Sequence, residues 1–273
     1  MVSLPFADHC EPLLDDPGDF QEFVNWMQEE CCGQRHRYLE LRPVSELQEV
    51  RHGLRPVHSY WFHELSLVPS LGVIFQHMHK NSFQRKIRRA EREHVSYELG
   101  SSDHLIDEFY RLLLMTRRRH RLVPQPRSWF RNLVDSMGSR LQIRLARKNG
   151  TAIAAMLTLQ HGTSVVYKYG CSDGAYHFLG GVPFLFWRMI EESKTSGAEK
   201  IDFGRSELDN LGLITFKSRI GASRKLLTYY RYANPQRAEA IYSWESRGVR
   251  RLLSSLPDAV LSTAGSILYK HLG

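Results

Sequence analysis

Groups that can accept protons and stabilise negative charge crowd into one short stretch in the last third of the sequence. Asp202 and Glu207 supply carboxylates, which can accept a proton from a nucleophile. Arg205 and Lys217 supply cations, which can stabilise a developing oxyanion, and Ser206 adds a hydroxyl. Because these groups lie so close together in sequence, we interpret the stretch as a binding or catalytic site.

The pattern around these residues predicts a strand, a turn and a short helix. Lys200–Phe203 is expected to form a strand that ends at Gly204. A helix is expected over Leu213–Ile220, with Gly221 as its left-handed C-cap. In α/β folds ligands bind where strands end and helices begin, so these elements would gather the polar groups at the carboxyl end of a strand.

The preceding segment predicts an antiparallel meander followed by a helix. Strands are expected at Leu141–Ala146, Ala152–Leu159 and Ser164–Tyr169, because turn residues separate these short apolar runs. A polar loop with glycines follows, and Pro183 opens a helix that continues to Ser196. The order of elements is therefore meander, loop, helix, strand.

This order resembles the second domain of the FemABX-like acyltransferases, a branch of the GNAT superfamily. The matching pieces are Asp202–Ser206, Gly212–Ala222, a basic helix at Ser82–Val95 and the helix at Gly180–Ser196. The resemblance covers Val2–Ala233 and implies an α/β (α+β) fold. That fold would be a GNAT-like mixed sheet flanked by helices, in a tandem FemABX-like arrangement with an incomplete first GNAT-like unit.

The resemblance also implies how the chain is divided. The expected parts are a partial first GNAT-like unit at 1–70, a basic linking helix at 71–94, the acyltransferase domain at 95–233 and a basic helical tail at 234–273. In the first part we expect strands at Val2–Phe6, Arg37–Leu41 and Val57–Leu67. We also expect a helix start at Asp16–Asp19 and a short helix at Ser45–Val50. Because the sequence opens on a strand, the first unit is expected to lack the first strands and helix of the family.

The activity implied by the resemblance is transfer of an acyl or aminoacyl group to an amine of a cell-envelope precursor or sugar, which forms an amide. The co-substrate would be an acyl-CoA thioester or an aminoacyl-tRNA, with no tightly bound cofactor. In the family the lysine of the matching helix is implicated near the acyl donor, so Lys217 is the first catalytic candidate. Arg205 is the second cation, and Asp202 or Glu207 would accept the proton of the amine.

Structural roles compete with these assignments. Lys217 could be a solvent-exposed helix lysine, and Asp202 could cap the turn or pair with Arg205. In the GNAT fold the last meander strand and the strand after the helix splay apart, and the acyl donor enters the opening. One wall would be formed by Tyr167–Tyr169 and the other by Asp202–Ser206. The residues expected to bind substrate are Tyr169, Ser206, Phe216 and Arg219, together with Lys86 and Arg89 of the basic helix.

A glycine-containing loop is the expected phosphate site of the donor. GNAT enzymes typically hold the coenzyme A pyrophosphate with a QxxGxG/A loop at a helix start. The corresponding loop, Tyr176–Val182, offers the amides of Gly180, Gly181 and Val182. It lacks the full motif, and Pro183 contributes no amide. The donor therefore stays open between the thioester and the aminoacyl-tRNA.

Leu71–His94 is predicted to form one long basic helix. Lys86 and Arg89 belong to a run of cations with few acidic i,i+4 partners, which favours phosphate binding. The alternative is a solvated face of an amphipathic helix. A second basic cluster, Arg117–Arg121, ends the helix expected after Ser102, where cations also stabilise a helix C-terminus.

The composition indicates an anionic partner. The formal net charge is +8 over 273 residues, which favours a lipid-linked or other anionic envelope precursor, tRNA or an anionic membrane surface. No apolar run reaches the ~18 residues of a membrane span, and the cysteines lack zinc or disulfide spacing. We therefore expect a cytoplasmic protein without a metal, with peripheral contact at the inner membrane face left open. The alternative function is a noncatalytic phosphate- or nucleic-acid-binding protein that keeps the GNAT-like fold.

Overall fold

The computed structural model describes residues 2, 4, 7–34, 36–47 and 53–235. Contacts divide these residues into two units. The first unit comprises the residues up to His63, Gly204–Ile214 and 224–235, and the second comprises Glu64–Phe203 and Thr215–Ser223. Three strands and one helix continue from one unit into the other. The division at 70, 94 and 233 expected from the sequence stays a prediction.

A helix packed on paired strands forms the core of the first unit. The short 3-10 segment η1 (Pro17–Asp19) leads into α1 (Phe20–Gly33), and the Asp16 carboxylate accepts the Gly18 N–H at 2.7 Å. This confirms the predicted helix start. Strand β1 (Tyr38–Leu41) pairs antiparallel with β8 (Ser223–Ala233). The apolar residues buried between them include Val24, Met27, Cys31, Leu39, Leu41 and Tyr230.

Two short elements predicted for the first unit are not found among the described residues. Val2 forms an isolated parallel bridge to Glu40 instead of opening a strand, and residues 3, 5 and 6 lie outside the described part. Ser45 is not helical, because its N–H and its hydroxyl both donate to the Glu11 carboxylate, at 2.7 and 2.9 Å. The rest of the predicted helix beyond Leu47 and the predicted tail beyond Pro235 lie outside the described residues.

The predicted meander forms the sheet of the second unit. The antiparallel strands are β3 (Ser96–Gly100), β4 (Leu141–Lys148), β5 (Thr151–His161) and β6 (Ser164–Ser172), and β7 (Lys200–Glu207) pairs parallel with β6. With β2 (Leu54–Ser66), the hydrogen-bonding order is β1-β8-β2-β7-β6-β5-β4-β3. The expected α/β fold with a mixed sheet flanked by helices is confirmed.

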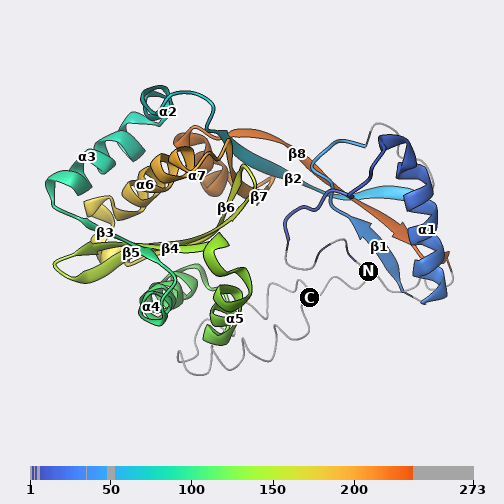
Figure 1. Ribbon diagram of the computed structural model, residues 1–273, viewed down its shortest axis with the longest axis horizontal. Helices are drawn as coiled ribbons and strands as arrows, with labels where there is room; N and C mark the ends of the chain where they lie inside the picture. The colour runs from blue at the N-terminus through green and yellow to red at the C-terminus, as the bar shows by residue number, and fades with distance from the viewer. Residues whose placement is uncertain (1, 3, 5–6, 35, 48–52, 236–273) are drawn as a thin grey trace. The chain divides into compact units, whose positions relative to one another are not determined.

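Helices cover both faces of the second unit's sheet (Figure 1). On one face lie α2 (Leu71–His77), α3 (Arg85–Arg92), α6 (Gly181–Thr195) and α7 (Leu211–Ile220), and on the other lie α4 (Asp103–His120) and α5 (Arg127–Met137). The short segment η3 (Gly138–Arg140) joins α5 to β4, and η4 (Gly174–Leu179) joins β6 to α6. Among the described helices, none has the length and apolar character needed to cross a bilayer.

The single long helix predicted at Leu71–His94 is wrong. The chain instead forms α2, an extended residue at Met78, the π-helical turn η2 (Lys80–Gln84) and then α3. The break arises because the His79 N–H donates to the Arg219 carbonyl at 2.8 Å and not to the preceding turn. The Gln84 amide meanwhile donates to the Met78 carbonyl at 2.7 Å. The Arg219 carbonyl and the Gln84 side chain therefore bond to the His79 N–H and the Met78 carbonyl, which would pair within the helix if it were continuous.

Candidate active site

The parallel pairing of β6 with β7 is short, as the resemblance implied. In the described strands it runs from Ser164–Lys200 to Val166–Asp202, and β6 continues to Ser172 beyond the last pair. Asp202 is buried, with 7% of its surface exposed, at the point where the pairing stops. This catalytic candidate therefore lies where the pairing of β6 with β7 ends.

A β-bulge in β6 changes which side chains face this opening. On β5, Leu157 pairs with Tyr169 and Thr158 pairs with Tyr167, so Lys168 is an additional residue on β6. The Tyr167 ring consequently packs on Phe186, on the α6 face of the sheet, whereas Tyr169 packs with the α4 and α5 core on the other face. Tyr167 and Tyr169, which were expected in one wall of the opening, therefore face opposite sides of the sheet, because the bulge interrupts the alternation of side chains.

Tyr167 is held as a neutral phenol on the α6 face. Its ring centroid lies 4.8 Å from that of Phe186 and 6.0 Å from that of Phe203. Burial raises the pKa of the Tyr167 phenol, and the nearby Cys171 raises it further. Gly170 makes room for the hydroxyl, because a Cβ atom at that position would overlap it. The Tyr167 hydroxyl can therefore donate or accept a hydrogen bond without ionising.

Tyr169, a predicted substrate residue, joins a polar chain on the opposite face. The buried Gln125 donates from Nε2 to the Tyr169 hydroxyl at 3.2 Å and accepts from Arg117 Nη2 at 3.3 Å. Arg117 is half-buried, and no carboxylate among the described residues forms an ion pair with it. A cation held this way, next to a neutral amide, can bind an anionic group.

The sequence interpretation missed this chain of three residues. Arg117 was noticed only as part of a basic helix end, and Gln125 lies in the loop between two helices. A glutamine enclosed by prolines, shortly after an arginine-rich helix end, is the signal that could have indicated it. Neither the pairing nor the bulge that turns Tyr169 toward them is visible in the sequence.

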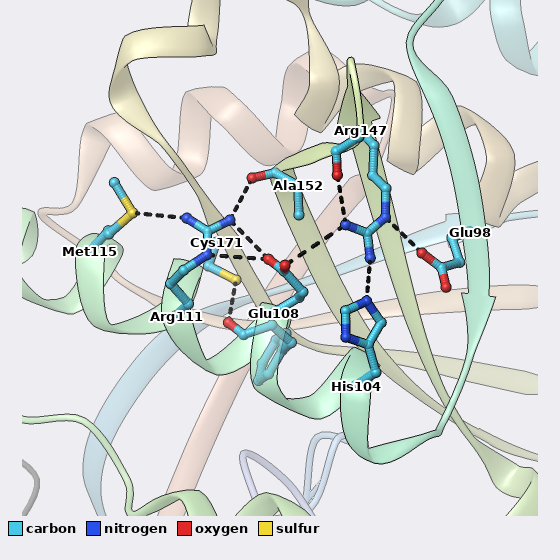
Figure 2. Close-up of polar contacts among 10 residues, drawn as sticks. Glu98, His104, Glu108, Arg111, Met115, Arg147, Ala152 and Cys171 are labelled. Atoms are coloured by element: carbon cyan, nitrogen blue, oxygen red, sulfur yellow. Dashed lines mark hydrogen bonds and ion pairs between the residues drawn. The ribbon is translucent and has the colours of Figure 1, made fainter.

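A polar network fixes the helix that carries Arg117. Figure 2 shows Arg147 of β4 donating to Glu98 of β3, at 2.7 Å, and approaching the His104 ring of α4, at 3.2 Å. On the next turns of α4, Arg111 donates to Glu108 at 2.9 Å and to the Ala152 carbonyl of β5 at 2.8 Å. These contacts tie α4 to β4 and β5 and so hold the helix that carries Arg117.

The expected phosphate loop precedes α6 and touches the basic helix. Gly180 has a φ of +79°, and a Cβ atom there would overlap the Lys86 carbonyl of α3. Only glycine satisfies both demands. Gly181 and Val182 supply N–H groups of the first turn of α6, Pro183 supplies none, and the Gly180 carbonyl accepts from Phe184 N–H at 3.0 Å.

Cations surround this loop. The Ser172 hydroxyl lies 2.8 Å from Nε2 of His177, and Arg119 Nη1 donates to the Ser172 carbonyl at 3.2 Å. Burial lowers the pKa of His177, and the charges of Arg119 and Lys86 lower it further, while Asp173 opposes them. Arg119 and Lys86 are therefore close enough to the His177 imidazole to disfavour its protonated form. An anion bound at the loop would be attracted by the charges of Arg119 and Lys86.

The predicted residues of the basic helix and of α7 occupy two kinds of environment. Lys86 and Arg89 are exposed on α3, and the Arg89 guanidinium carbon lies 5.3 Å from the Phe178 ring centroid. Lys217 is only 4% exposed, so its interpretation as a solvent-exposed lysine is wrong. Phe216 packs against Phe83 with centroids 5.7 Å apart, whereas Arg219 is exposed.

The remaining predicted site residues belong to the first unit. The strand does not end at Phe203 as predicted, because Gly204, at a φ of +66°, continues β7 to Glu207. Gly204 leaves space for the Asp8 carboxylate, which accepts the Arg205 N–H at 3.1 Å. A Cβ atom at Gly204 would overlap this carboxylate. The local geometry therefore depends on the glycine.

Arg205 is enclosed by aromatic groups in the first unit. Its guanidinium carbon lies 4.1 Å from the Tyr60 ring centroid, and its Nη1 donates to the Tyr229 hydroxyl at 2.8 Å. Burial lowers the Arg205 pKa, but the surrounding tyrosine and carboxylate groups outweigh it and raise the value overall. Ser206 is 2% exposed, and Glu207 is exposed at the end of the strand.

Comparisons with known proteins agree with this fold. The chain aligns with FemX at a TM-score of 0.67 and 12% identity, covering 86% of this chain and 79% of FemX. It aligns with L-PGS from Bacillus licheniformis at a TM-score of 0.56 and 13% identity, covering 87% of this chain and 78% of L-PGS. A third similar structure is the C-terminal domain (DUF2156) of an Agrobacterium fabrum protein provisionally named lysylphosphatidylglycerol synthetase. It aligns at a TM-score of 0.58 and 15% identity, covering 82% of this chain and 76% of that domain.

The sequence comparisons assign the family. No curated protein matches the chain by sequence. The family model described as the acetyltransferase (GNAT) domain matches residues 78–218, which is more than half of the chain. This match favours the transferase over the noncatalytic alternative. The chain belongs to the GNAT acetyltransferase-domain family and is an enzyme of the acyltransferase class.

Proposed function

We propose that the protein forms an amide by transferring an acyl or aminoacyl group to an amine of a cell-envelope precursor or a sugar. The observation that carries the proposal is the end of the β6–β7 pairing at Val166–Asp202, where a GNAT-type opening begins beside a buried carboxylate. The similar structures support the envelope assignment, because one of them is named for lysyl transfer to phosphatidylglycerol. The donor is an acyl-CoA or an aminoacyl-tRNA.

The proposed reaction requires a base and an oxyanion site. The amine nitrogen attacks the carbonyl carbon of the donor, a C–N bond forms, and the bond to the thiolate or ribose oxygen breaks. Asp202 is the proposed proton acceptor, with Glu207 as the other candidate. Lys217 is the proposed oxyanion partner and Arg205 the second cation. The leaving group takes a proton when the tetrahedral intermediate collapses.

The proposed partners are anionic. The proposed site for an anionic group of the acceptor is Arg117 and Gln125, next to Tyr169. The proposed site for the phosphates of the donor is Lys86, Arg119 and the loop before α6. Arg89, Phe216, Arg219 and Ser206 remain candidates for substrate contacts. A lipid-linked acceptor would bring the protein to the inner membrane face.

The proposal is tested by ligand-dependent thermal stability of the full chain. Acetyl-CoA, longer acyl-CoAs, charged tRNA and uncharged tRNA would each be added at low and moderate salt. A shift with an acyl-CoA, or with charged tRNA only, identifies the donor, and product formation with amine acceptors then identifies the reaction. Equal shifts with charged and uncharged tRNA that salt abolishes would contradict transfer, because they indicate electrostatic contact alone.

A matched pair of variants makes this test specific. Lys217→Ala should abolish transfer, whereas Arg224→Ala, which removes another cation of the chain, should leave it unchanged. Electrostatic binding of nucleic acid should stay nearly intact in Lys217→Ala, because this lysine is buried and contacts phosphates poorly.

A further inference from the structure

One aromatic ring is exposed among the cations of the second unit. Phe178 belongs to η4, directly before the α6 loop, and 55% of its surface is exposed. Exposing an aromatic ring to water costs free energy that its burial would recover, so the ring has no role in the core. Its position at the loop indicates a contact with something outside the described residues.

The ring already carries a planar cation. The guanidinium carbon of Arg89 lies 5.3 Å from the Phe178 ring centroid, and the Arg89 Nε lies 3.9 Å from Glu93 Oε1. A guanidinium over an aromatic ring defines the ring's orientation and enriches the site in positive charge. Because more than half of Phe178 is still exposed, there is area left for a second flat group.

Phosphate-binding groups lie next to this ring. His177 precedes it in sequence, and both Lys86 and Arg119 act on the charge of His177. Among the described residues, Asp173 opposes these two cations, and its carboxylate also accepts the Ala175 N–H at 2.9 Å. The loop therefore combines a stacking surface with an excess of positive charge, which is the combination that recognises a nucleotide.

We propose that Phe178 and Arg89 stack the adenine base of the donor, while Lys86 and Arg119 attract its phosphates. The proposal rests on the proposed function, because both candidate donors carry an adenosine with phosphates: coenzyme A within its nucleotide, and aminoacyl-tRNA at its 3′ end. Stacking tolerates either source, since every adenine presents the same flat face. A membrane contact by an exposed aromatic among cations is the competing explanation.

The test is isothermal titration of the full chain with ligands that contain or lack the adenosine. Coenzyme A and adenosine 3′,5′-bisphosphate contain it, and 4′-phosphopantetheine lacks it. A stable 3′-aminoacylamido analogue of the CCA end stands in for aminoacyl-tRNA. Phe178→Ala should weaken the adenosine-containing donor by about 5- to 100-fold, which is the range for loss of one stacked base. It should leave the affinity for 4′-phosphopantetheine unchanged.

Control variants separate stacking from folding. Phe178→Trp should preserve the affinity, because a larger ring still stacks. Trp26→Ala removes another exposed aromatic, 57% exposed on α1 of the first unit, and should change nothing. Which adenosine ligand responds to Phe178→Ala identifies the source, either coenzyme A or the CCA end.

Several outcomes would overturn the proposal. One is an equal loss of affinity for 4′-phosphopantetheine, and another is no loss for any adenosine ligand. A third is a loss confined to binding of anionic phosphatidylglycerol vesicles, which would make the ring a membrane contact. Transfer from phosphopantetheine thioesters without adenosine binding would refute the stacking but keep the proposed function. Adenosine binding that depends on Phe178, without any transfer, would refute the proposed function but keep the stacking.

Discussion

Tyr167 and Tyr169 lie two positions apart on β6, yet their rings pack on opposite faces of the sheet. In a regular strand, residues two apart face the same side. The additional residue Lys168 reverses the alternation at the place where the pairing with β7 has already stopped. One strand thus supplies a phenol to each side of the opening, one beside α6 and one beside Arg117.

The first prediction concerns the room that Gly170 leaves for Tyr167. Gly170→Ala should lower the free energy of unfolding by about 1–3 kcal/mol, because the added methyl overlaps the Tyr167 hydroxyl. The double variant with Tyr167→Phe should recover part of this loss, since the nearest atom is removed. Urea unfolding of both variants and of Tyr167→Phe alone measures the coupling. If the two substitutions change the free energy of unfolding additively, the predicted overlap between the residue 170 methyl and the Tyr167 hydroxyl is contradicted.

Local signals were sufficient to predict much of the fold. The meander followed from apolar runs separated by turn residues, and the helix after it from Pro183. The break at Met78 was not predictable, because it depends on a hydrogen bond from His79 to Arg219, which lies far away in sequence. Alternation and periodicity describe neighbours in sequence and carry no information about such partners.

The candidate site was predictable in its residue types more than in its arrangement. The sequence indicates that Gly180 and Gly204 lie at the candidate site. The groups that leave no space for a side chain there, the Lys86 carbonyl and the Asp8 carboxylate, come from other segments. The burial of Lys217 was also not visible, because a helix of mixed composition gives little indication of which face is covered. Tertiary contacts settle these points.

The second prediction concerns Gly180 at the α6 loop. Gly180→Ala should lower the free energy of unfolding by about 2–4 kcal/mol, because the methyl meets the Lys86 carbonyl and the φ of +79° disfavours a side chain. Gly197→Ala is the matched control, since its φ is +83° but no atom lies within 4 Å of the added methyl. It should cost only about 1 kcal/mol. Equal costs in urea unfolding would contradict the close approach to α3.

The third prediction concerns the polar chain on the α4 face. Gln125→Leu should leave the Arg117 guanidinium and the Tyr169 hydroxyl without their shared amide partner. If they bind the acceptor, KM for the acceptor rises by about 10-fold or more, while the donor Kd is unchanged. Steady-state kinetics with donor titration separates the two quantities. A weaker donor affinity would assign this chain to the donor side.

The fourth prediction concerns pH and Glu40 in the first unit. Glu40 accepts from Arg42 Nε at 2.9 Å and from Arg231 Nη2 at 2.5 Å. Burial alone would raise the Glu40 pKa, but these two arginines outweigh it and lower the value. A carboxylate whose folded pKa lies below its unfolded value stabilises the fold above the unfolded value, and the stabilisation is lost as pH falls through the folded value.

Glu40→Gln should therefore lower the free energy of unfolding at pH 7 by about 2–4 kcal/mol. The difference from the unaltered chain should shrink as the pH falls below the ordinary glutamate pKa of about 4.3, where the unfolded carboxylate becomes protonated, and down through the lower folded pKa, where the native one does. Urea unfolding of both chains between pH 7 and pH 3 measures this. A difference that does not change with pH would mean that packing, and not charge, makes Glu40 important.

The last prediction concerns Lys217, whose amine is buried on α7 with 4% of the residue exposed. If it stabilises the oxyanion, Lys217→Met should lower kcat by about 10²–10³-fold. The donor Kd should change little, because the oxyanion exists only after the amine has attacked. Arg224→Met, which removes an exposed cation of β8 that has no proposed role, is the control and should retain most of the activity. Titration calorimetry and single-turnover kinetics separate binding from chemistry. A donor Kd that weakens as much as kcat falls would make Lys217 a ground-state binding residue and would move the oxyanion role to Arg205.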